Sequence, residues 1–311
     1  MEFVLMTEPH LGGSFDDLVE LAEFARRAGM AGFARSDHYY SERRPTPPAT
    51  DAYVTLAAIA TRVPEIRLAV LVSPITFRHP AVIAKSAASL DEISGGRFDL
   101  GVGTGWYRFE HDAFGLPFPP WEERFARLEE TLAYLRAAFA GGRATFQGRY
   151  YRLDAEPLPR PTGLRIVVGG RGPLRTPRLA GTYADEYNHF VAPSDEIAPK
   201  VERMRRAALE TGRSVPAVSV MGTVLAGLDR GSYRKRLQAW ADERSVTAEH
   251  LEERLRNAGV PAGTPDRLAE TFAELKAVGV SRYYLQWLDL QDRSGLEETW
   301  EAVSQAVRAL D

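Results

Sequence analysis

Cysteine is absent from this chain of 311 residues, and lysine occurs only four times. The absence of cysteine excludes disulfide bonds, thiolate nucleophiles, iron–sulfur clusters and cysteine-ligated zinc. Redox chemistry would therefore need a bound organic cofactor. The six histidines are scattered and show neither H-x-H nor H-x-x-x-H spacing, so we expect no metal site. The G-x-S-x-G sequence of serine hydrolases is also missing.

Long apolar runs are absent as well. No segment approaches the roughly 18 apolar residues that a membrane-spanning helix needs, and the opening residues MEFVLMTEPH lack the pattern of a signal peptide. The formal net charge of −3 provides no basic surface for nucleic acid or for an anionic membrane. We therefore expect a cytoplasmic protein that binds a small organic substrate, and neither nucleic acid nor a membrane.

Short apolar runs are present in number, and each is followed by a polar or glycine-rich loop and then by helical periodicity. The eight runs span residues 3–7, 32–36, 67–72, 98–103, 165–170, 186–190, 218–226 and 282–287. Strands that alternate with helices are typical of a parallel sheet, and eight such units over this length favour a (β/α)8 TIM barrel over an open sheet. The clearest helices between strands are the amphipathic segments 15–29 and 81–96.

Two stretches exceed a minimal barrel, and we expect them to be insertions after strands four and seven. Residues 140–163 predict a hairpin about Gln147–Gly148, and residues 229–262 predict a charged, mostly helical excursion. Neither holds enough apolar residues for a core of its own. We therefore expect a single barrel domain over residues 1–311.

The second strand ends in GFARSDHYY, residues 32–40, where titratable groups follow small and apolar residues. In a (β/α)8 barrel the active site is built at the carboxyl ends of the strands, so Asp37 and His38 would lie at its mouth. A plainer interpretation stays open, because Ser and Asp are common in turns and caps and a single histidine is often structural.

The fourth strand continues into GVGTGWYRFEHDAFG, residues 101–115. The glycines let the backbone approach a flat ligand, Trp106 offers an aromatic surface, and Glu110 offers a proton or a hydrogen-bond partner. We expect no dinucleotide fingerprint here, because the next helix is expected only near Trp121.

A phosphate site is predicted where the fifth strand ends in VVGGRGPLRTPRLAG, residues 167–181. Glycines precede a helix with Thr176 near its first turn, so backbone N–H groups, the helix dipole, the Thr176 hydroxyl and Arg171 would converge on a phosphate. A simple tight turn between strand and helix is the alternative. Together with the apolar, aromatic mouth, this site indicates a flavin-like pocket.

Four blocks of the sequence resemble the luciferase-like monooxygenase superfamily, in the branch of oxidoreductases that use coenzyme F420. They are SDH at 36–38, TFRHPAVIAKSAASLDEISGGRFDLGVGTGW at 76–106, GGRGPLRTPRLAGTYADEYN at 169–188 and AGTPDRLAETFAELKAVGVSRYYLQ at 262–286. The resemblance runs along essentially the whole chain. It implies that the cofactor ring lies at the mouth of the barrel, where a hydride moves at the central ring.

The resemblance also assigns roles to single residues. His38 matches the histidine that assists proton transfer in several deazaflavin enzymes, and we expect Asp37 to orient it and Glu110 to be the nearest acid. A cis peptide that backs the ring in family members maps to Ser73–Pro74, where proline lowers the cost of the cis form to about 0.5–1 kcal/mol. An ordinary trans proline that ends the strand is the alternative. Relatives that act on sugar phosphates carry an acid where Trp106 stands, which argues against that substrate class.

Further residues are expected to hold the cofactor. The full set of expected contacts is Ser73, Pro74, Gly103, Thr104, Gly105, Trp106, Gly169, Gly170, Arg171, Gly172 and Thr176. The anionic tail of coenzyme F420 would need additional cations, for which Arg78, Arg108 and Arg175 are candidates.

Three functions are consistent with these residues. The leading hypothesis is an F420-dependent oxidoreductase that transfers a hydride between the deazaflavin and an organic substrate held by loops 39–50, 107–120 and 229–262. One alternative is an FMN-dependent monooxygenase that uses reduced flavin and oxygen. Another is a non-catalytic protein that binds flavin or deazaflavin. As in similar proteins, we expect helices of the first half to form a homodimer interface.

Overall fold

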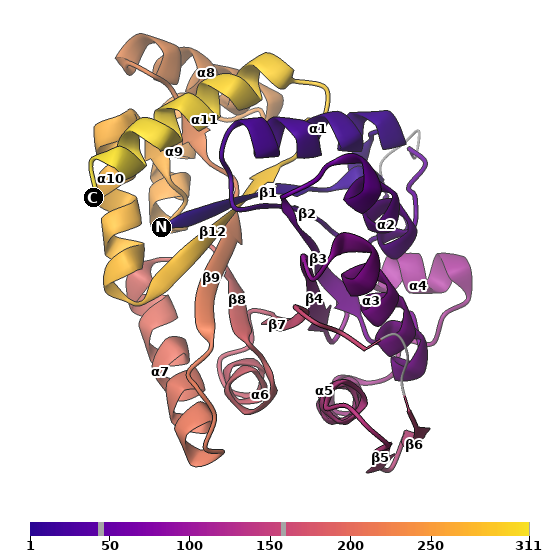
Figure 1. Ribbon diagram of the computed structural model, residues 1–311. Coiled ribbons are helices and arrows are strands. Elements are labelled where there is room, and N and C mark those ends of the chain that lie inside the picture. The colour runs from indigo at the N-terminus through magenta and orange to yellow at the C-terminus, as the bar shows by residue number, and fades with distance from the viewer. Residues whose placement is uncertain (43–46, 157–159, 311) are drawn as a thin grey trace.

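The computed structural model describes residues 1–42, 47–156 and 160–310, and its central feature is a closed barrel of eight parallel strands (Figure 1). The strands are β1 (Glu2–Thr7), β2 (Gly32–Arg35), β3 (Arg67–Pro74), β4 (Phe98–Gly103), β7 (Arg165–Gly169), β8 (Glu186–Phe190), β9 (Ala217–Gly222) and β12 (Val280–Trp287). They pair in chain order, and β12 closes the barrel against β1. The predicted (β/α)8 barrel and its eight strand positions are confirmed.

One predicted strand is divided. The run 218–226 ends as a barrel strand at Gly222, and Leu225–Ala226 form a separate strand, β10, which pairs with β11 (Ala262–Gly263). The chain leaves the barrel ladder at Thr223, whose carbonyl accepts a hydrogen bond from the Tyr283 hydroxyl of the neighbouring strand. Residues 218–226 form one apolar run in the sequence, although the chain passes from the barrel sheet to a second, two-stranded sheet within it.

Helices surround the barrel in the order that the sequence indicates. Those that follow the barrel strands are α1 (Phe15–Arg27), α2 (Ala52–Arg62), α3 (Pro80–Ser94), α5 (Trp121–Phe139), α6 (Arg175–Tyr183), α7 (Ser194–Glu210), α10 (Pro265–Ala277) and α11 (Arg293–Arg308). Local sequence sets their ends: Ser14 and Asp17 form a capping box at the start of α1, and Gly95 adopts a left-handed conformation after α3. In the part of the chain that the structure describes, no helix has the length and apolar character to cross a bilayer.

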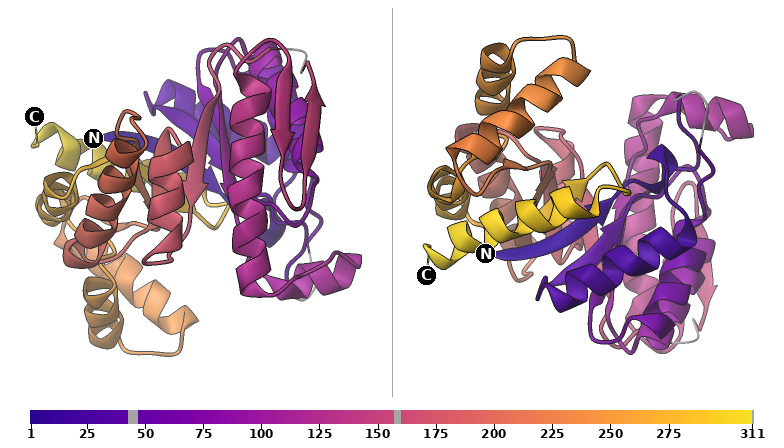
Figure 2. Two further views of the ribbon diagram at one scale, coloured as in Figure 1. Left: turned by 90° about the horizontal axis from the view of Figure 1, so that it is seen from below. Right: turned by 90° about the horizontal axis from the view of Figure 1, so that it is seen from above.

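Both predicted insertions form and lie on different sides of the barrel (Figure 2). Strands β5 (Ala144–Gln147) and β6 (Arg152–Ala155) make an antiparallel hairpin beside α5. Helices α8 (Arg230–Glu243) and α9 (Ala248–Asn257) make up the second insertion. These two helices and β10 bury a small apolar cluster made of Leu225, Tyr233, Leu237, Ala241 and Leu251.

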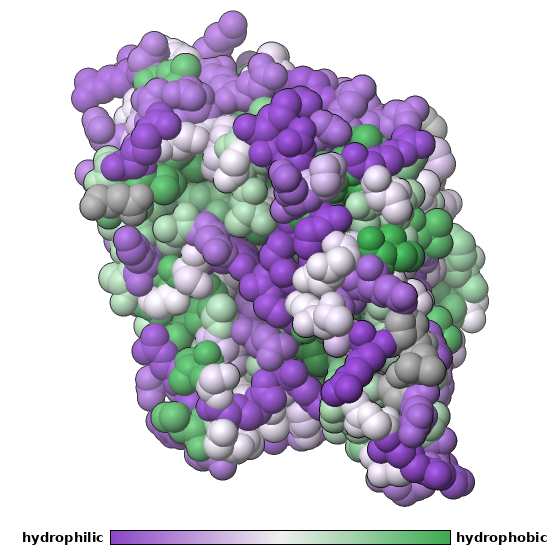
Figure 3. Space-filling view, viewed as in Figure 1, coloured by the Kyte–Doolittle hydropathy of each residue, from purple (hydrophilic) through white to green (hydrophobic). Residues whose placement is uncertain are grey.

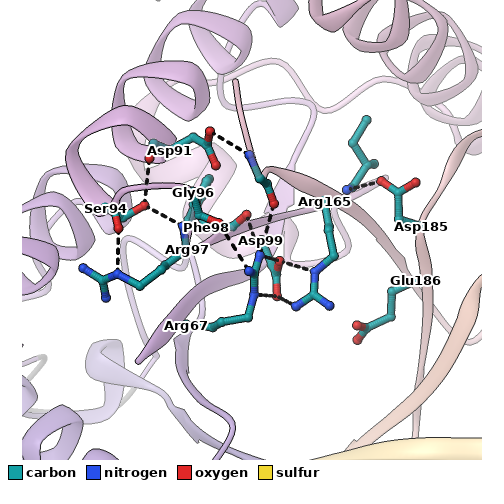
Figure 4. Close-up of polar contacts among 12 residues, drawn as sticks. Arg67, Asp91, Ser94, Gly96, Arg97, Phe98, Asp99, Arg165, Asp185 and Glu186 are labelled. Atoms are coloured by element: carbon teal, nitrogen blue, oxygen red, sulfur yellow. Dashed lines mark hydrogen bonds and ion pairs between the residues drawn. The ribbon is translucent and has the colours of Figure 1, made fainter. Parts of the chain in front are cut away.

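The amino-terminal end of the barrel is filled with paired charges. Asp99 on β4 lies between two arginines, with Arg67 Nη2 2.5 Å from Oδ1 and Arg165 Nη2 2.7 Å from Oδ2 (Figure 4). Arg282 on β12 pairs with Glu186 on β8 in the same layer. In this arrangement the charged groups pair with one another. The opposite, carboxyl end of the strands is left for a ligand.

The outer surface is mixed in character. Hydrophilic residues cross the middle of the face seen in Figure 1, and hydrophobic residues appear between them in separate groups (Figure 3). Isolated apolar groups of this kind are normal on a protein surface. The feature that points to function is therefore a cavity in the barrel and not a patch on this face.

Candidate active site

A cavity of about 550 Å³ opens at the carboxyl ends of the barrel strands. Each of the eight barrel strands contributes a lining residue, which lies either in the strand or directly after its carboxyl end. These residues are Glu8, Ser36, Val72, Gly103, Gly169, Asn188, Met221 and Gln286. The cavity is therefore the mouth of the barrel, where the sequence predicted the site.

His38 and Glu110 form a hydrogen-bonded pair at this cavity. His38 Nδ1 lies 2.9 Å from Glu110 Oε1, and the other carboxylate oxygen accepts a hydrogen bond of 3.0 Å from the backbone N–H of Tyr39. Glu110 is supplied by the short helix α4 (Arg108–Phe114) and is buried. The two contacts fix the carboxylate, so the imidazole ring is held in one orientation with Nε2 left for a ligand.

The pKa of His38 reflects two opposing effects. Burial lowers the pKa, but the hydrogen bond and the negative charge of Glu110 outweigh burial and raise the pKa from its ordinary value. Glu8 and Asp37 add to the increase through their charges. Glu110 therefore stabilises the protonated form of His38.

Asp37 lies at the cavity as predicted, but it does not hold His38. Its carboxylate forms a two-point ion pair with Arg78 and accepts a hydrogen bond of 2.7 Å from the Ser73 hydroxyl. The expectation that Asp37 orients the histidine is wrong, because adjacent residues of an extended segment point in different directions. Glu110, 72 residues away in sequence, takes that role.

The glycine-rich turn after β4 lines the cavity through Gly103, Thr104, Gly105 and Trp106. A Cβ on Gly103 would lie 2.9 Å from a methyl group of Val72, so only glycine lets this strand and β3 pack together here. Trp106 is 68% exposed. The expectation that no helix begins before Trp121 is wrong, since α4 starts at Arg108. Its seven residues make about two turns, which is too short to show a helical period in the sequence.

Strand β3 forms the wall behind the site. Leu71, Val72 and Pro74 line the cavity. Ser73 is fully buried and hydrogen-bonds to Asp37 and Tyr53, so it is a support and not a lining residue. The cis peptide is Leu71–Val72, and the mapping to Ser73–Pro74 is wrong. Ser73–Pro74 is not cis, as the alternative of an ordinary trans proline had it. The register with β4 shifts between Val70 and Ser73.

The residues predicted to bind a phosphate come together just before and in the first turn of α6. Gly169, Gly170, Arg171, Gly172 and Thr176 all line the cavity. Gly170 has φ +153, and a Cβ on Gly172 would lie 2.9 Å from Thr176 Oγ1. No side chain caps α6 at Leu174, so its first N–H groups are available to an anion. This glycine cradle fits a phosphate group.

Several other predicted residues serve different purposes. Arg78 is occupied by Asp37 and Asp51, so it is not free for a cofactor tail. Arg108 pairs with Asp112, while Arg175 lies over the ring of Phe125.

The loops expected to hold substrate contribute unequally. No described residue of 229–262 lines the cavity, and within 39–50 the described residues do not line it either, although 43–46 lie outside the described residues. Tyr39 and Tyr40 stack instead on Phe77 and Phe109. Residues 157–159 of the first insertion also lie outside the described residues.

One wall of the cavity was missed by the sequence analysis. Glu8 and His10 follow β1, and Gln286 on β12 donates a hydrogen bond of 2.7 Å to Glu8 Oε1. The His10 ring lies 4.6 Å from the His38 ring, measured between centroids. The rule that placed His38 at the mouth applies equally to residues after β1, so Glu8 could have been found from its position alone.

The fold and the site define a (β/α)8 barrel whose mouth contains a histidine–glutamate pair and a glycine-rich turn before a helix. The luciferase-like monooxygenase family matches residues 1–282, and the chain belongs to this family. The resemblance recognised in the sequence is thereby confirmed.

Relatives with assigned activities share part of the chain. An F420-dependent glucose-6-phosphate dehydrogenase of Nakamurella multipartita is 36% identical over 180 residues, which are 55% of this chain and 51% of that protein. The enzyme of the same name from Nocardia farcinica is 34% identical over 214 residues, 66% of this chain and 62% of that protein. The chain thus spans between half and two thirds of the length of these curated relatives.

Solved structures match the whole chain at low identity. An F420-dependent secondary alcohol dehydrogenase in complex with an F420-acetone adduct has a TM-score of 0.81 at 17% identity and covers 98% of each chain. The monooxygenase RslO1 from Streptomyces bottropensis has a TM-score of 0.81 at 21% identity and covers 99% of each chain. At these identities the likeness shows the fold.

Proposed function

We propose that this chain is an F420-dependent oxidoreductase that transfers a hydride between the deazaflavin and an organic substrate. The observation that carries the proposal is the His38–Glu110 pair at a cavity that is also lined by the glycine-rich turn before α6. The F420-dependent relatives support the choice of cofactor.

The residues present fit this cofactor. Gly103, Gly169 and Val72 line one wall of the cavity, and a Cβ on either glycine would collide with Val72. The cofactor ring would lie against this wall. Gly170, Gly172 and Thr176 would hold the phosphate. When bound, the deazaflavin supplies a site that accepts or gives a hydride.

The protein's own contribution is to move a proton. With Nδ1–H donating to Glu110, the neutral His38 ring presents a lone pair at Nε2, which accepts the proton of a substrate hydroxyl. The resulting imidazolium is stabilised by the Glu110 carboxylate at 2.9 Å. In the reverse direction, Nε2 returns the proton to a carbonyl oxygen. The Trp106 ring lies 5.7 Å from the His38 ring in an edge-to-face arrangement, measured between centroids.

The test begins with cofactor binding. Purified protein is titrated with coenzyme F420 and with FMN, and binding is followed by fluorescence quenching. We expect tight binding of F420 and weak binding of FMN. Preference for FMN would replace the proposal with a flavin monooxygenase, and binding of neither would favour a protein without this activity.

The role of His38 is tested by substitution. We expect His38→Ala to lower kcat by about 10²–10⁴-fold, the usual contribution of a general acid or base, while F420 affinity changes little. His250→Ala, at an exposed position on α9, is the matched control and should retain wild-type turnover. Equal activity of His38→Ala and wild type would remove His38 from the mechanism.

We also propose a homodimer through the helices of the first half. Val54 on α2 is 71% exposed, and Val82 and Ile93 on α3 are 50% and 49% exposed. The two helices contact each other, which places exposed apolar side chains on neighbouring elements. Analytical ultracentrifugation should give the mass of a dimer, and Val54→Glu should shift it toward the monomer; a monomeric wild type would refute the interface.

A further inference from the structure

Resting on the proposed function, we infer that Arg171, Lys200 and Arg203 form a binding site for the chain of carboxylates that follows the phosphate in coenzyme F420. These three cations gather beside the glycine turn before α6. Of the three arginines that the sequence analysis assigned to this tail, Arg78 and Arg108 form ion pairs within the protein. The cations beside the turn are therefore better placed to meet it.

Lys200 on α7 is held by a neutral histidine. Its ammonium nitrogen lies 2.8 Å from Nε2 of His189 on β8. The other ring nitrogen, Nδ1, donates to the backbone carbonyl of Phe190, so Nε2 is the acceptor. Burial lowers the pKa of His189 to about 4, and the positive charge of Lys200 adds to the decrease. The imidazole is therefore uncharged at neutral pH and leaves the charge of Lys200 uncompensated.

The sequence offers Lys200 an acidic partner that it does not use. Glu196 lies four residues earlier on α7, which is the favourable spacing for an ion pair on a helix. The ammonium group contacts His189 instead, on the side of the helix that faces the barrel. Lys200 is thus directed toward the end of β8 and not along its own helix.

Arg171 meets the same end of β8 from the glycine turn. Its guanidinium carbon lies 4.1 Å from the centre of the Phe190 ring, the residue after His189. The charge of Arg171 also contributes to the lowered pKa of His189. Arg171 lines the cavity and is exposed, so it stands where a ligand leaves the site for solvent.

Arg203 approaches the turn from α7, one helical turn beyond Lys200. Its Nη1 donates a hydrogen bond of 2.7 Å to the backbone carbonyl of Pro173, the residue after Gly172. Helices α6 and α7 lie side by side, which brings this face of α7 to the start of α6 (Figure 1). Arg203 is exposed apart from this contact.

The three cations share one environment without an acidic partner. Within residues 1–42, 47–156 and 160–310, no carboxylate lies within ion-pair distance of Arg171, Lys200 or Arg203, whereas Arg178 on α6 pairs with Glu129 at 3.1 Å. Like charges around one turn repel each other, and an anionic ligand would remove that repulsion.

This arrangement fits a flexible chain of carboxylates that continues from a phosphate. A phosphate held by the turn before α6 would bring the next groups of the cofactor among these side chains. Guanidinium groups can bind a carboxylate with two parallel hydrogen bonds, and an ammonium group binds it as a point charge. Because the side chains are partly exposed, each ion pair would be modest in strength and sensitive to salt.

The first experiment measures binding and not turnover. The protein is titrated by fluorescence quenching with F420 that carries several glutamates, and with a truncated form that keeps the ring, the phosphate and the lactyl group but has no glutamate. We expect the dissociation constant to be about tenfold lower for the form with the tail, and this preference to shrink when the salt concentration is raised. Equal affinity for the two forms would overturn the inference. Failure to bind either form would instead overturn the proposed function.

The second experiment assigns the preference to these residues. The double variant Lys200→Met with Arg203→Met should lose most of the preference for the tail and keep wild-type affinity for the truncated cofactor. Lys200→Arg with Arg203→Lys keeps both charges and should retain the preference.

The matched control is Arg205→Met, on the same helix. Its guanidinium lies next to Gly279, before β12, and so away from the turn. This variant removes the same type of charge from α7 and should bind both forms as the wild type does. A double variant that binds both forms more weakly by the same factor would show a merely structural role, and one that keeps the full preference would refute the assignment.

Discussion

The buried ion pair between Asp37 and Arg78 allows a quantitative test of what stabilises the carboxyl end of the barrel. The Asp37 side chain is 0% exposed and that of Arg78 is 10% exposed. Arg78 Nη2 also lies 2.5 Å from Asp51 Oδ2, and its guanidinium sits 4.8 Å from the centre of the Tyr53 ring. We predict that Arg78→Met destabilises the protein strongly, because Asp37 would be left as a buried charge without its partner.

The magnitude follows from what remains around Asp37. Removing one partner of a buried pair costs about 3–5 kcal/mol. The Ser73 hydroxyl, at 2.7 Å, still donates to the carboxylate, so we expect the lower end, about 3 kcal/mol. Burial raises the pKa of Asp37 and Arg78 lowers it, so the variant has a still higher folded-state pKa. A carboxyl group whose pKa is raised in the folded state destabilises the fold increasingly as pH rises and the group must ionise. The free energy of unfolding that Arg78→Met loses should therefore be larger at pH 7 than at pH 5.

The assay is urea unfolding followed by circular dichroism at both pH values. The double variant Arg78→Met with Asp37→Asn should recover most of the loss, because no unpaired charge remains. Arg108→Met, which breaks the exposed pair with Asp112, is the surface control and should cost no more than about 0.5 kcal/mol. A loss below about 1 kcal/mol for Arg78→Met, or no recovery in the double variant, would refute the reasoning.

Three further predictions concern the catalytic pair and the phosphate site. Glu110→Gln removes the charge that raises the pKa of His38, so the acidic limb of the pH profile for substrate oxidation should move to lower pH; a limb that stays in place would contradict the assigned partner. Thr176→Ala should weaken F420 binding by about 1 kcal/mol or somewhat more, measured by fluorescence titration, and unchanged affinity would separate Thr176 from the phosphate. Gly172→Ala places a Cβ 2.9 Å from Thr176 Oγ1 and should lower F420 affinity by at least about tenfold without loss of folding, as checked by the same titration and by circular dichroism; wild-type affinity would argue against a glycine cradle.

Much of the site could be predicted because it follows from strand ends. His38, the turn after β4 and the glycines before α6 line the cavity as the barrel rule requires. The same rule, applied to β1, would have found Glu8. The partner of His38 could not be found in this way. Helix α4 is too short to show a helical period in the sequence, and the position of the Glu110 side chain depends on how this helix packs.

The sequence by itself determined the architecture of this protein, since buried strands and amphipathic helices leave periodic patterns along the chain. It also determined which cofactor chemistry is open to it, because the absence of cysteine and the two glycine-rich turns are local properties. Only the tertiary structure decided which side chains meet: Glu110 and not Asp37 beside His38, and Arg78 buried against Asp37. These contacts join residues 41 to 72 positions apart, and their geometry is set by the packing of whole elements against one another, which no local pattern encodes.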